Sequence, residues 1–322
     1  MEKREHAFWA LMVLMALALV VLGFMRLAGQ DLSARQTEGR RKLGAVYMTL
    51  NNPFYEVVDE EIRTAVENRG DVLISRDPAL SVERQNEEIE ELIEDGVKLI
   101  FINPVDWQKC VPAIEKARRA GVQVIVIDTN VEDESLVAST VVSDNYLAGQ
   151  QCAQHLVGTR QGGKVALLTH VQARSAQERI QGFLDTLAHY PAFQVVDQAE
   201  CQGQLETAMP AMEKMIGRHP EIDIVMALND PAAMGAMAAL RQAGRLEGVA
   251  VYGVDGVTET RDLIAQGHMQ ATAGQDPRGL GRMAVEQAYT VLGGGQPEPL
   301  VKLPTVLITR ENVKASNGEG WE

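Results

Sequence analysis

Residues 43–75 read LGAVYMTLNNPFYEVVDEEIRTAVENRGDVLIS. The apolar run Leu43–Leu50 predicts a strand, Pro53–Asn68 an amphipathic helix, and Val72–Ser75 a second strand. Gly70 supplies the left-handed cap that commonly ends a helix before the next strand. This order predicts a β-α-β unit, which joins parallel strands and requires both faces of the sheet to be covered.

The same alternation of strands and helices continues along the chain. Further predicted strands are Leu99–Asn103, Val124–Asp128, Val165–Thr169, Gln194–Val196, Ile224–Ala227 and Val249–Asp255. Further predicted helices are Val82–Asp95, Asp106–Ala120, Arg174–His189, Gln204–His219 and Pro231–Ala243. The pattern predicts an α/β, doubly wound class, with two groups of units on either side of Val141–Asn145.

The composition is that of a globular chain of about two domains. The 322 residues are 46% hydrophobic and 23% charged, with a net charge of −14. Residues 1–42 carry seven basic and four acidic side chains, so residues 43–322 have a net charge of −17. An acidic body repels phosphate, which excludes nucleic acid as a partner. The three cysteines and six histidines show no metal-binding spacing, and we predict no metal and no cofactor.

The amino terminus holds an uncharged run of 19 residues, Ala7–Met25. At about 1.5 Å per residue the run can cross a bilayer core of about 30 Å. Signal peptides have shorter apolar regions, so residues 1–26 favour an uncleaved signal-anchor over a cleaved signal peptide. We predict that residues 27–42 form a tether. The basic residues there argue against export of the chain that follows, because basic residues usually stay on the cytoplasmic side of a membrane. The orientation of the span is therefore left open.

Polar side chains stand where six of the apolar runs end. They are Asn51 to Tyr55, Asn103, Asp128 to Asn130, Asn229 with Asp230, Asp255 and Gln275. Ligands of open parallel sheets bind beyond the carboxyl ends of the strands. These positions therefore predict a cleft lined with amide and carboxylate groups.

Seven short motifs are spread through residues 43–310. They are TLNNPFY at Thr49–Tyr55, FINP at Phe101–Pro104, SDN at Ser143–Asn145, SAQER at Ser175–Arg179 with Gly182 and Phe183 after it, ALND at Ala227–Asp230, GVDG at Gly253–Gly256 and AGQ at Ala273–Gln275. In this order and spacing they resemble the type I periplasmic sugar-binding proteins, most closely the ribose-binding branch. The resemblance implies two doubly wound parallel-sheet lobes, joined by a hinge of three crossovers, that close on a monosaccharide without altering it.

The resemblance also implies boundaries and binding residues. The N-terminal lobe would be residues 43–142 plus 276–304, and the C-terminal lobe residues 143–275 plus 305–310, followed by a tail over 311–322. The implied ligand-binding residues are Asn52, Phe54, Tyr55, Asn103 and Asp128 on the first lobe, and Arg179, Asn229, Asp255 and Gln275 on the second lobe and the hinge. Carboxylates accept hydroxyl protons, and Arg and amide groups donate to sugar oxygens.

Simpler interpretations exist for three of these residues. Asn103 and Asn229 are also typical turn residues, and Phe54 also fits a core position of its helix. Three departures from the family pattern bear on the ligand: Thr129 stands where ribose binders have Arg, Val254 where they have an aromatic residue, and Met48 where they have a polar residue. The identity of the ligand is therefore left open between a pentose, a different sugar and a polyol of similar size.

The resemblance implies an extracytoplasmic protein in the periplasm or at the cell surface, anchored to the membrane by its N-terminal helix, that delivers its ligand to an ABC transporter permease. A sensor that presents the bound ligand to a histidine kinase is the alternative. A glycosidase built on Asp128 and Asp255 is disfavoured, because nothing in the sequence marks either as an acid with a raised pKa. A repressor is disfavoured because the apolar run stands where a DNA-binding motif would precede the fold. We therefore predict no enzyme activity.

Overall fold

The computed structural model describes residues 40–314 and Trp321. The expected anchor over residues 1–26, nearly all of the tether that precedes the first strand, and much of the tail over 311–322 lie outside the described residues. Within the part of the chain that is described, no helix is long and apolar enough to span a membrane.

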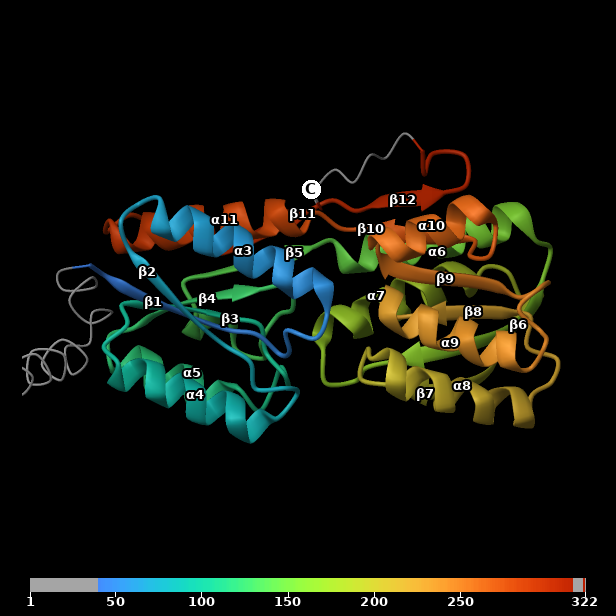
Figure 1. The fold of residues 1–322 in the computed structure, drawn as a ribbon, viewed down its shortest axis with the longest axis horizontal. Coiled ribbons are helices and arrows are strands. Elements are labelled where there is room, and N and C mark those ends of the chain that lie inside the picture. Colours follow the sequence, from blue (N-terminus) through green and yellow to red (C-terminus); the bar gives the residue numbers. More distant parts are fainter. Residues whose placement is uncertain (1–39, 315–320, 322) are drawn as a thin grey trace, which may run out of the picture. The chain divides into compact units, whose positions relative to one another are not determined.

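The first of two sheets is entirely parallel, with strand order β11-β5-β4-β3-β1-β2. Its strands are β1 (Lys42–Val46), β2 (Val72–Arg76), β3 (Leu99–Ile102), β4 (Gln123–Ile127), β5 (Ser139–Ser143) and β11 (Leu300–Leu303). Helices α3 (Pro53–Glu67) and α11 (Pro277–Leu292) pack together on one face, and α4 (Val82–Glu94) and α5 (Val111–Arg119) pack together on the other (Figure 1).

The second sheet has the order β12-β10-β9-β8-β6-β7, and only its edge strand β12 is antiparallel. Its strands are β6 (Gly163–Thr169), β7 (Phe193–Glu200), β8 (Ile224–Ala227), β9 (Ala250–Asp255), β10 (Ala271–Gly274) and β12 (Val306–Thr309). Its helices pair as α6 (Asn145–Thr159) with α7 (Arg174–Leu187) and α8 (Leu205–Arg218) with α9 (Asp230–Gln242), while α10 (Thr258–Gln266) contacts β10 and β12.

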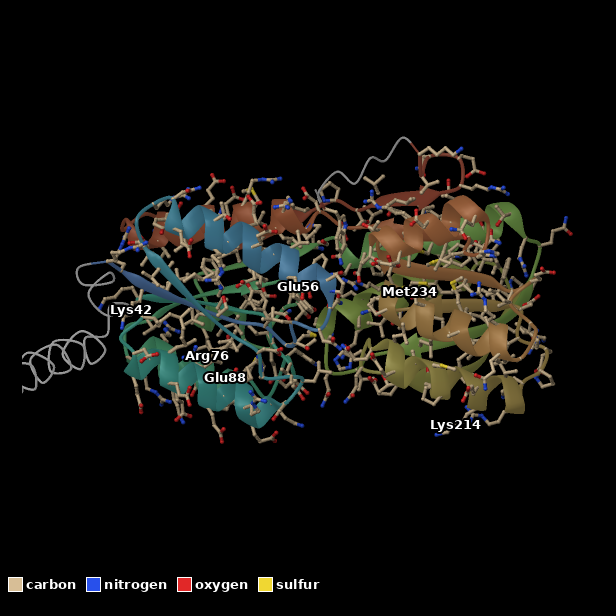
Figure 2. All side chains as sticks on the ribbon, in the orientation of Figure 1. Lys42, Glu56, Arg76, Glu88, Lys214 and Met234 are labelled. Carbon is tan, nitrogen blue, oxygen red and sulfur yellow. The ribbon has the colours of Figure 1, made fainter. Side chains whose placement is uncertain are left out.

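Burial explains why the central strands are continuously apolar. Every residue of β3 (LIFI) and β8 (IVMA) is buried, because helices cover both faces of each sheet. The helices are amphipathic instead, so that polar residues such as Glu56 of α3 and Lys214 of α8 are exposed on their outer faces (Figure 2).

The chain passes between the two sheets three times. The passages lie between β5 and α6, between β10 and α11, and between β11 and β12. The carboxyl ends of strands from both sheets meet at one place, and the loops that follow them carry the polar residues described below.

Some predicted boundaries are wrong, for local reasons. The first strand ends at Val46 rather than Leu50. The helix predicted from Asp106 begins at Val111, because the Asp106 carboxylate accepts the backbone N–H groups of Gln108 and Lys109, at 3.0 and 3.1 Å, and holds a separate turn. Four strands are absent from the predicted strands. The edge strands β11 and β12 are short and largely exposed. The strands β5 (STVVS) and β10 (ATAG) are buried, but small and hydroxyl-bearing residues make up much of their sequence.

Candidate ligand-binding site

A pocket of about 400 Å³, including its opening to solvent, lies where the strand ends of the two sheets meet. Eight of the nine predicted binding residues line it: Asn52, Phe54, Tyr55, Asp128, Arg179, Asn229, Asp255 and Gln275. Asn103 is the exception, since it is fully buried behind the pocket wall.

The start of helix α3 forms the aromatic part of the wall. The Asn52 side chain caps the helix by accepting the Phe54 N–H at 3.0 Å, which fixes where the helix begins. The Phe54 ring lies edge-on to Tyr55, with centroids 5.4 Å apart, and also contacts Trp321 at 6.0 Å. The Tyr55 hydroxyl donates to Asp128 Oδ2 at 3.0 Å, so that this ring also positions the carboxylate.

Asp128 follows β4 and is held from behind. Asn103 Nδ2 donates to Asp128 Oδ2 at 3.3 Å, and Asn103 Oδ1 accepts the Met48 N–H at 3.0 Å. Asn103 therefore supports the pocket and does not line it. Asp128 has a φ of 68°, a left-handed conformation that is uncommon outside glycine and is often found at functional sites.

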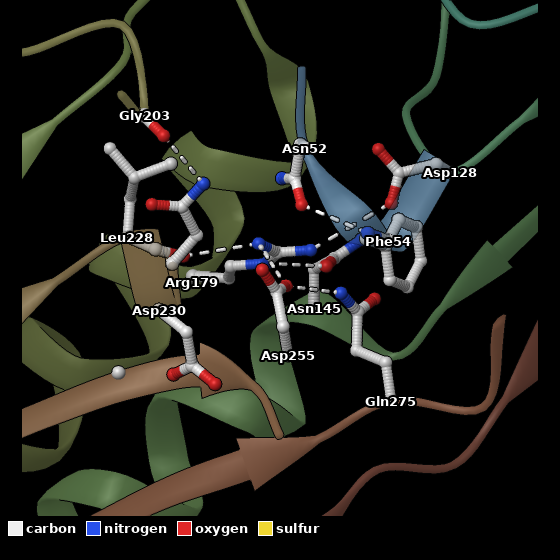
Figure 3. A network of polar contacts seen from close by, with 12 residues as sticks. Asn52, Phe54, Asp128, Asn145, Arg179, Gly203, Leu228, Asp230, Asp255 and Gln275 are labelled. Atoms are coloured by element: carbon white, nitrogen blue, oxygen red, sulfur yellow. Dashed lines mark hydrogen bonds and ion pairs between the residues drawn. The ribbon is translucent and has the colours of Figure 1, made fainter. Parts of the chain in front are cut away.

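Arg179 of α7 joins the two sides of the pocket (Figure 3). Its Nε donates to Asn145 Oδ1 at 2.8 Å and its Nη1 to the Leu228 carbonyl at 3.0 Å. The guanidinium also lies 3.8 Å from Asp128 and 3.6 Å from Asp255. The single cation thus faces one buried carboxylate from each sheet.

Asp255 ends β9 with a φ of 130°, again in the region that favours glycine. Its Oδ1 accepts from Gln275 Nε2 at 2.7 Å, whereas its Oδ2 is buried without a partner, as is Gln275 Oε1. Both atoms belong to residues that line the pocket, and both can accept a hydrogen bond. A buried acceptor without a partner costs about 1–3 kcal/mol, which a ligand donor would recover.

Burial shapes the electrostatics of both carboxylates. Desolvation raises the pKa of Asp255 well above its ordinary value, because the attraction of Arg179 is offset by repulsion from Asp230 and Asp128. Desolvation also raises the pKa of Asp128, although Arg179, Tyr55 and Asn103 oppose the rise. The sequence does not mark either carboxylate as an acid with a raised pKa, but burial in the structure raises the pKa of both. Both carboxylates nevertheless pair with the same guanidinium, as ligand-anchoring groups would.

The remaining side of the pocket is built by a loop and a helix cap. Asn229 caps α9 by accepting the Ala232 N–H at 3.0 Å, and its Nδ2 donates to the Gly203 carbonyl at 3.0 Å. Asn229 is therefore both a structural residue at the turn before α9 and a residue that lines the pocket. Thr129, which stands in place of the expected Arg, accepts the Ser175 N–H through Oγ1 at 2.9 Å and so links the two sides.

Sequence reasoning missed several residues of the site. His170, Gln202 and Gln204 line the pocket, and Asn145 holds Arg179. His170 directly follows β6, so the rule that ligands bind beyond strand ends would have identified it. Asn145 lies within one of the recognised motifs. Gln202 and Gln204 belong to a loop whose position the sequence pattern does not specify.

The cysteines are not candidates for nucleophilic chemistry. Burial raises the pKa of the Cys110, Cys152 and Cys201 thiols to about 12, and none of them lines the pocket. The pocket instead offers hydrogen-bond acceptors, one guanidinium and two aromatic rings. That set suits a small ligand with several hydroxyl groups.

Comparisons with known proteins match this architecture. A model described as a periplasmic binding protein domain matches residues 43–296. The ribose import binding protein RbsB of Bacillus subtilis (strain 168) is 30% identical over 307 residues, which cover 94% of this chain and 99% of that protein. The D-apiose import binding protein of Actinobacillus succinogenes is 30% identical over 272 residues, which cover 83% of this chain and 87% of that protein.

A solved structure is similar over nearly the same range. It is an ABC transporter solute-binding protein from Mycobacterium smegmatis with bound glycerol, at a TM-score of 0.82 and 31% identity, covering 86% of this chain and 96% of that one.

Proposed function

This chain belongs to the periplasmic binding protein family, and on that premise we propose that it is an extracytoplasmic protein that binds a monosaccharide or polyol and delivers it to an ABC transporter. The ligand would be released unchanged. The observation that carries the proposal is the placement of Arg179 between carboxylates from opposite sheets, next to unpartnered acceptors at Asp255 and Gln275.

The hydrogen-bonding capacity of the pocket supports a hydroxylated ligand. A hydroxyl group can donate to Asp255 Oδ2 or Gln275 Oε1 and accept from a neighbouring donor. A bond to a charged group such as the Arg179 guanidinium contributes about 1.5–3 kcal/mol and a bond to the neutral Gln275 amide about 0.5–1.5 kcal/mol, and a micromolar complex requires about −8 kcal/mol in total. A few bonds, together with contact on the Phe54 ring, are sufficient for that affinity.

The similar proteins favour a transporter as the partner. Both relatives are named as import binding proteins, and the similar solved structure as a transporter solute-binding protein. No observation of this kind favours a sensor histidine kinase. We also propose that the N-terminal segment over residues 1–26 anchors the protein to the cell membrane.

We propose that the two lobes, residues 43–142 plus 276–304 and residues 143–275 plus 305–310, move as bodies about the three passages between the sheets. Contacts between the lobes lie beside the pocket. Besides the bond between Thr129 and Ser175, the Trp107 N–H donates to the Gln172 carbonyl at 3.1 Å. A ligand held from both sides would stabilise this closed arrangement.

A thermal-shift screen of the purified full-length chain tests the proposal. The panel is D-ribose, D-allose, D-apiose, D-fucose, myo-inositol and glycerol, each at millimolar concentration. A ligand that binds only the folded state at about 100 times its Kd adds about 2.7 kcal/mol to the free energy of unfolding and raises the melting temperature.

The variant Asp255→Ala is the matched control, because it removes acceptors from the pocket without adding bulk. We expect the sugar that stabilises the wild type to lose its effect on this variant. If no monosaccharide or polyol raises the wild-type melting temperature, or if Asp255→Ala responds like the wild type, the proposed function or its site is wrong.

A further inference from the structure

His170 occupies a position in the pocket that neither the motifs nor the family resemblance assign. It follows the last residue of β6 and is 4% exposed. Its ring lines the same pocket as Arg179 and Asp255. Its Nδ1 lies 2.9 Å from Glu200 Oε1, at the end of the neighbouring strand β7.

Glu200 acts only as an acceptor in this arrangement. Its Oε2 accepts the Val171 N–H at 2.8 Å, and its Oε1 also accepts the Gln202 N–H at 2.9 Å. Burial alone would raise the pKa of Glu200, but the hydrogen bonds from His170, Val171 and Gln202 outweigh it, and the pKa lies below its ordinary value. A carboxylate that accepts from two backbone amides stays ionised at neutral pH.

The ionised carboxylate determines which ring nitrogen of His170 carries the proton. An ionised Glu200 has no proton to donate, so His170 Nδ1 must be the donor in their contact. In the neutral ring the other nitrogen, Nε2, then has a free lone pair. Glu200 thereby sets both the tautomer and the orientation of the ring.

The Nε2 atom is buried and has no partner in the structure. It joins Asp255 Oδ2 and Gln275 Oε1 as a third unpartnered polar atom on residues that line the pocket. All three are acceptors, and all three belong to the side of the second sheet. A ligand that satisfies them must present several hydrogen-bond donors to that side, as a polyhydroxylated molecule does.

We propose that His170 contacts the ligand directly, that its Nε2 accepts a hydrogen bond from a ligand hydroxyl group, and that Glu200 is the positioning residue that orients the ring and places the proton of the neutral ring on Nδ1. The inference rests on the proposed function, since it identifies a further specificity-determining contact of the same site. It selects ligands that carry a hydroxyl group at the position facing Nε2.

Substitution of His170 gives the first test. His170→Phe keeps a ring of similar shape but removes both nitrogen atoms, and we expect it to raise the Kd about tenfold for whichever panel sugar binds the wild type most tightly. The matched control is His155→Phe, because the partly buried His155 belongs to the same lobe but contacts Tyr252 at 3.0 Å, outside the pocket. Isothermal titration should show wild-type affinity for the control.

Nitrogen-15 NMR of the histidine rings gives a second test on the wild-type chain itself. We expect the His170 signals to report the Nδ1–H tautomer and the Nε2 signal to shift when the sugar is added. In Glu200→Gln the amide can donate to Nδ1, so the tautomer should change to Nε2–H and the Kd should rise.

The outcomes separate this inference from the proposed function. If the wild type binds a panel sugar but neither His170→Phe nor the Nε2 signal responds, His170 is not a ligand contact and the proposed function stands. If Glu200→Gln keeps the wild-type tautomer and affinity, the positioning role is wrong. If the wild type binds no sugar at all, the proposed function itself fails.

Discussion

Asp255, a proposed binding residue, illustrates how a group suited to ligand binding can oppose stability. It is buried, its backbone has a positive φ, and one carboxylate oxygen has no partner. Its pKa in the folded protein is raised well above the unfolded value, mainly by desolvation. The folded state therefore binds this proton more tightly than the unfolded chain does. The resulting stabilisation is complete below about pH 4 and is lost as the pH rises through the raised pKa.

Asp255→Asn should separate the two roles. The neutral amide has a similar shape and tolerates a positive φ, so we expect the ligand-free variant to be more stable than the wild type at pH 7. Sugar binding should weaken more than tenfold, because the charged acceptor is lost. Urea unfolding at several pH values checks the sign: the stability gain should shrink toward pH 4, and a gain independent of pH would contradict the argument.

Arg179 should behave differently when it is removed. The sequence alone predicts that Arg179→Ala weakens sugar binding more than tenfold and leaves the fold intact. The structure adds a cost in stability, because the variant leaves Asp128 and Asp255 buried without their shared cation. Breaking a buried ion pair costs about 3–5 kcal/mol. Chemical denaturation should detect this loss, and unchanged stability would show that the carboxylates are not held as the structure describes.

At the residue scale, the sequence predicted the polar residues of the pocket better than their contacts. The strand ends and the motifs identify Asp128, Arg179 and Asp255 as pocket residues, because the order of strands and helices along the chain determines which loops meet at the pocket. They do not reveal that Asn103 lies behind the wall, since the hydrogen bond from Asn103 to Asp128 depends on three-dimensional distance. They also do not show that Thr129 would contact Ser175 instead of the ligand.

At the element scale, Arg179 is positioned by the close packing of α6 against α7. A Cβ on Gly149 would lie 1.8 Å from the Arg179 carbonyl oxygen, and a Cβ on Gly182 would lie 2.1 Å from the Tyr146 carbonyl oxygen. Because backbone atoms cannot yield without moving a helix, both glycines are required for this approach. The contact therefore determines how far α7 projects Arg179 into the pocket.

Gly149→Ala should destabilise the protein by about 1–3 kcal/mol and weaken sugar binding, because it forces α7 away from α6. Gly158→Ala is the matched control on the same helix. A Cβ at Gly158 meets no atom within 4 Å, and alanine favours the helix by about 0.5–1 kcal/mol. Thermal unfolding should move in opposite directions for the two variants. A stabilised Gly149→Ala would show that the helices are not in this close contact.

Element prediction succeeded where burial imposes a pattern. Ile224–Ala227 was predicted at its observed bounds, because a buried parallel strand is a continuous apolar run between polar turns. It failed at β11 and β12, where edge strands are exposed and carry mixed residues, and at the buried strands β5 (STVVS) and β10 (ATAG), where small and hydroxyl-bearing residues interrupt the apolar pattern. It also placed the start of α5 too early, because the Asp106 turn resembles the first turn of a helix.

At the scale of the whole molecule, the proposed closure of the two lobes would depend in part on contacts that do not involve the ligand. Thr129 is fully buried, and its Oγ1 accepts the Ser175 N–H at the start of α7 at 2.9 Å. A hydrogen bond of this kind contributes about 1 kcal/mol, and under the proposed lobe movement it would form only in the closed arrangement. The proposal therefore predicts that this bond adds to the apparent affinity for any ligand by favouring the closed arrangement.

Thr129→Val keeps the shape of the side chain but removes the acceptor, so the Ser175 N–H loses its partner only in the closed form. We expect the Kd to rise about fivefold, corresponding to about 1 kcal/mol, for every ligand that binds. Small-angle scattering should show a larger radius of gyration for the ligand-free variant than for the wild type. Thr129→Ser retains the hydroxyl and should match the wild type in both measurements. An effect that differs between sugars would instead mean that Thr129 contacts the ligand itself, as the Arg of ribose binders at this position would suggest.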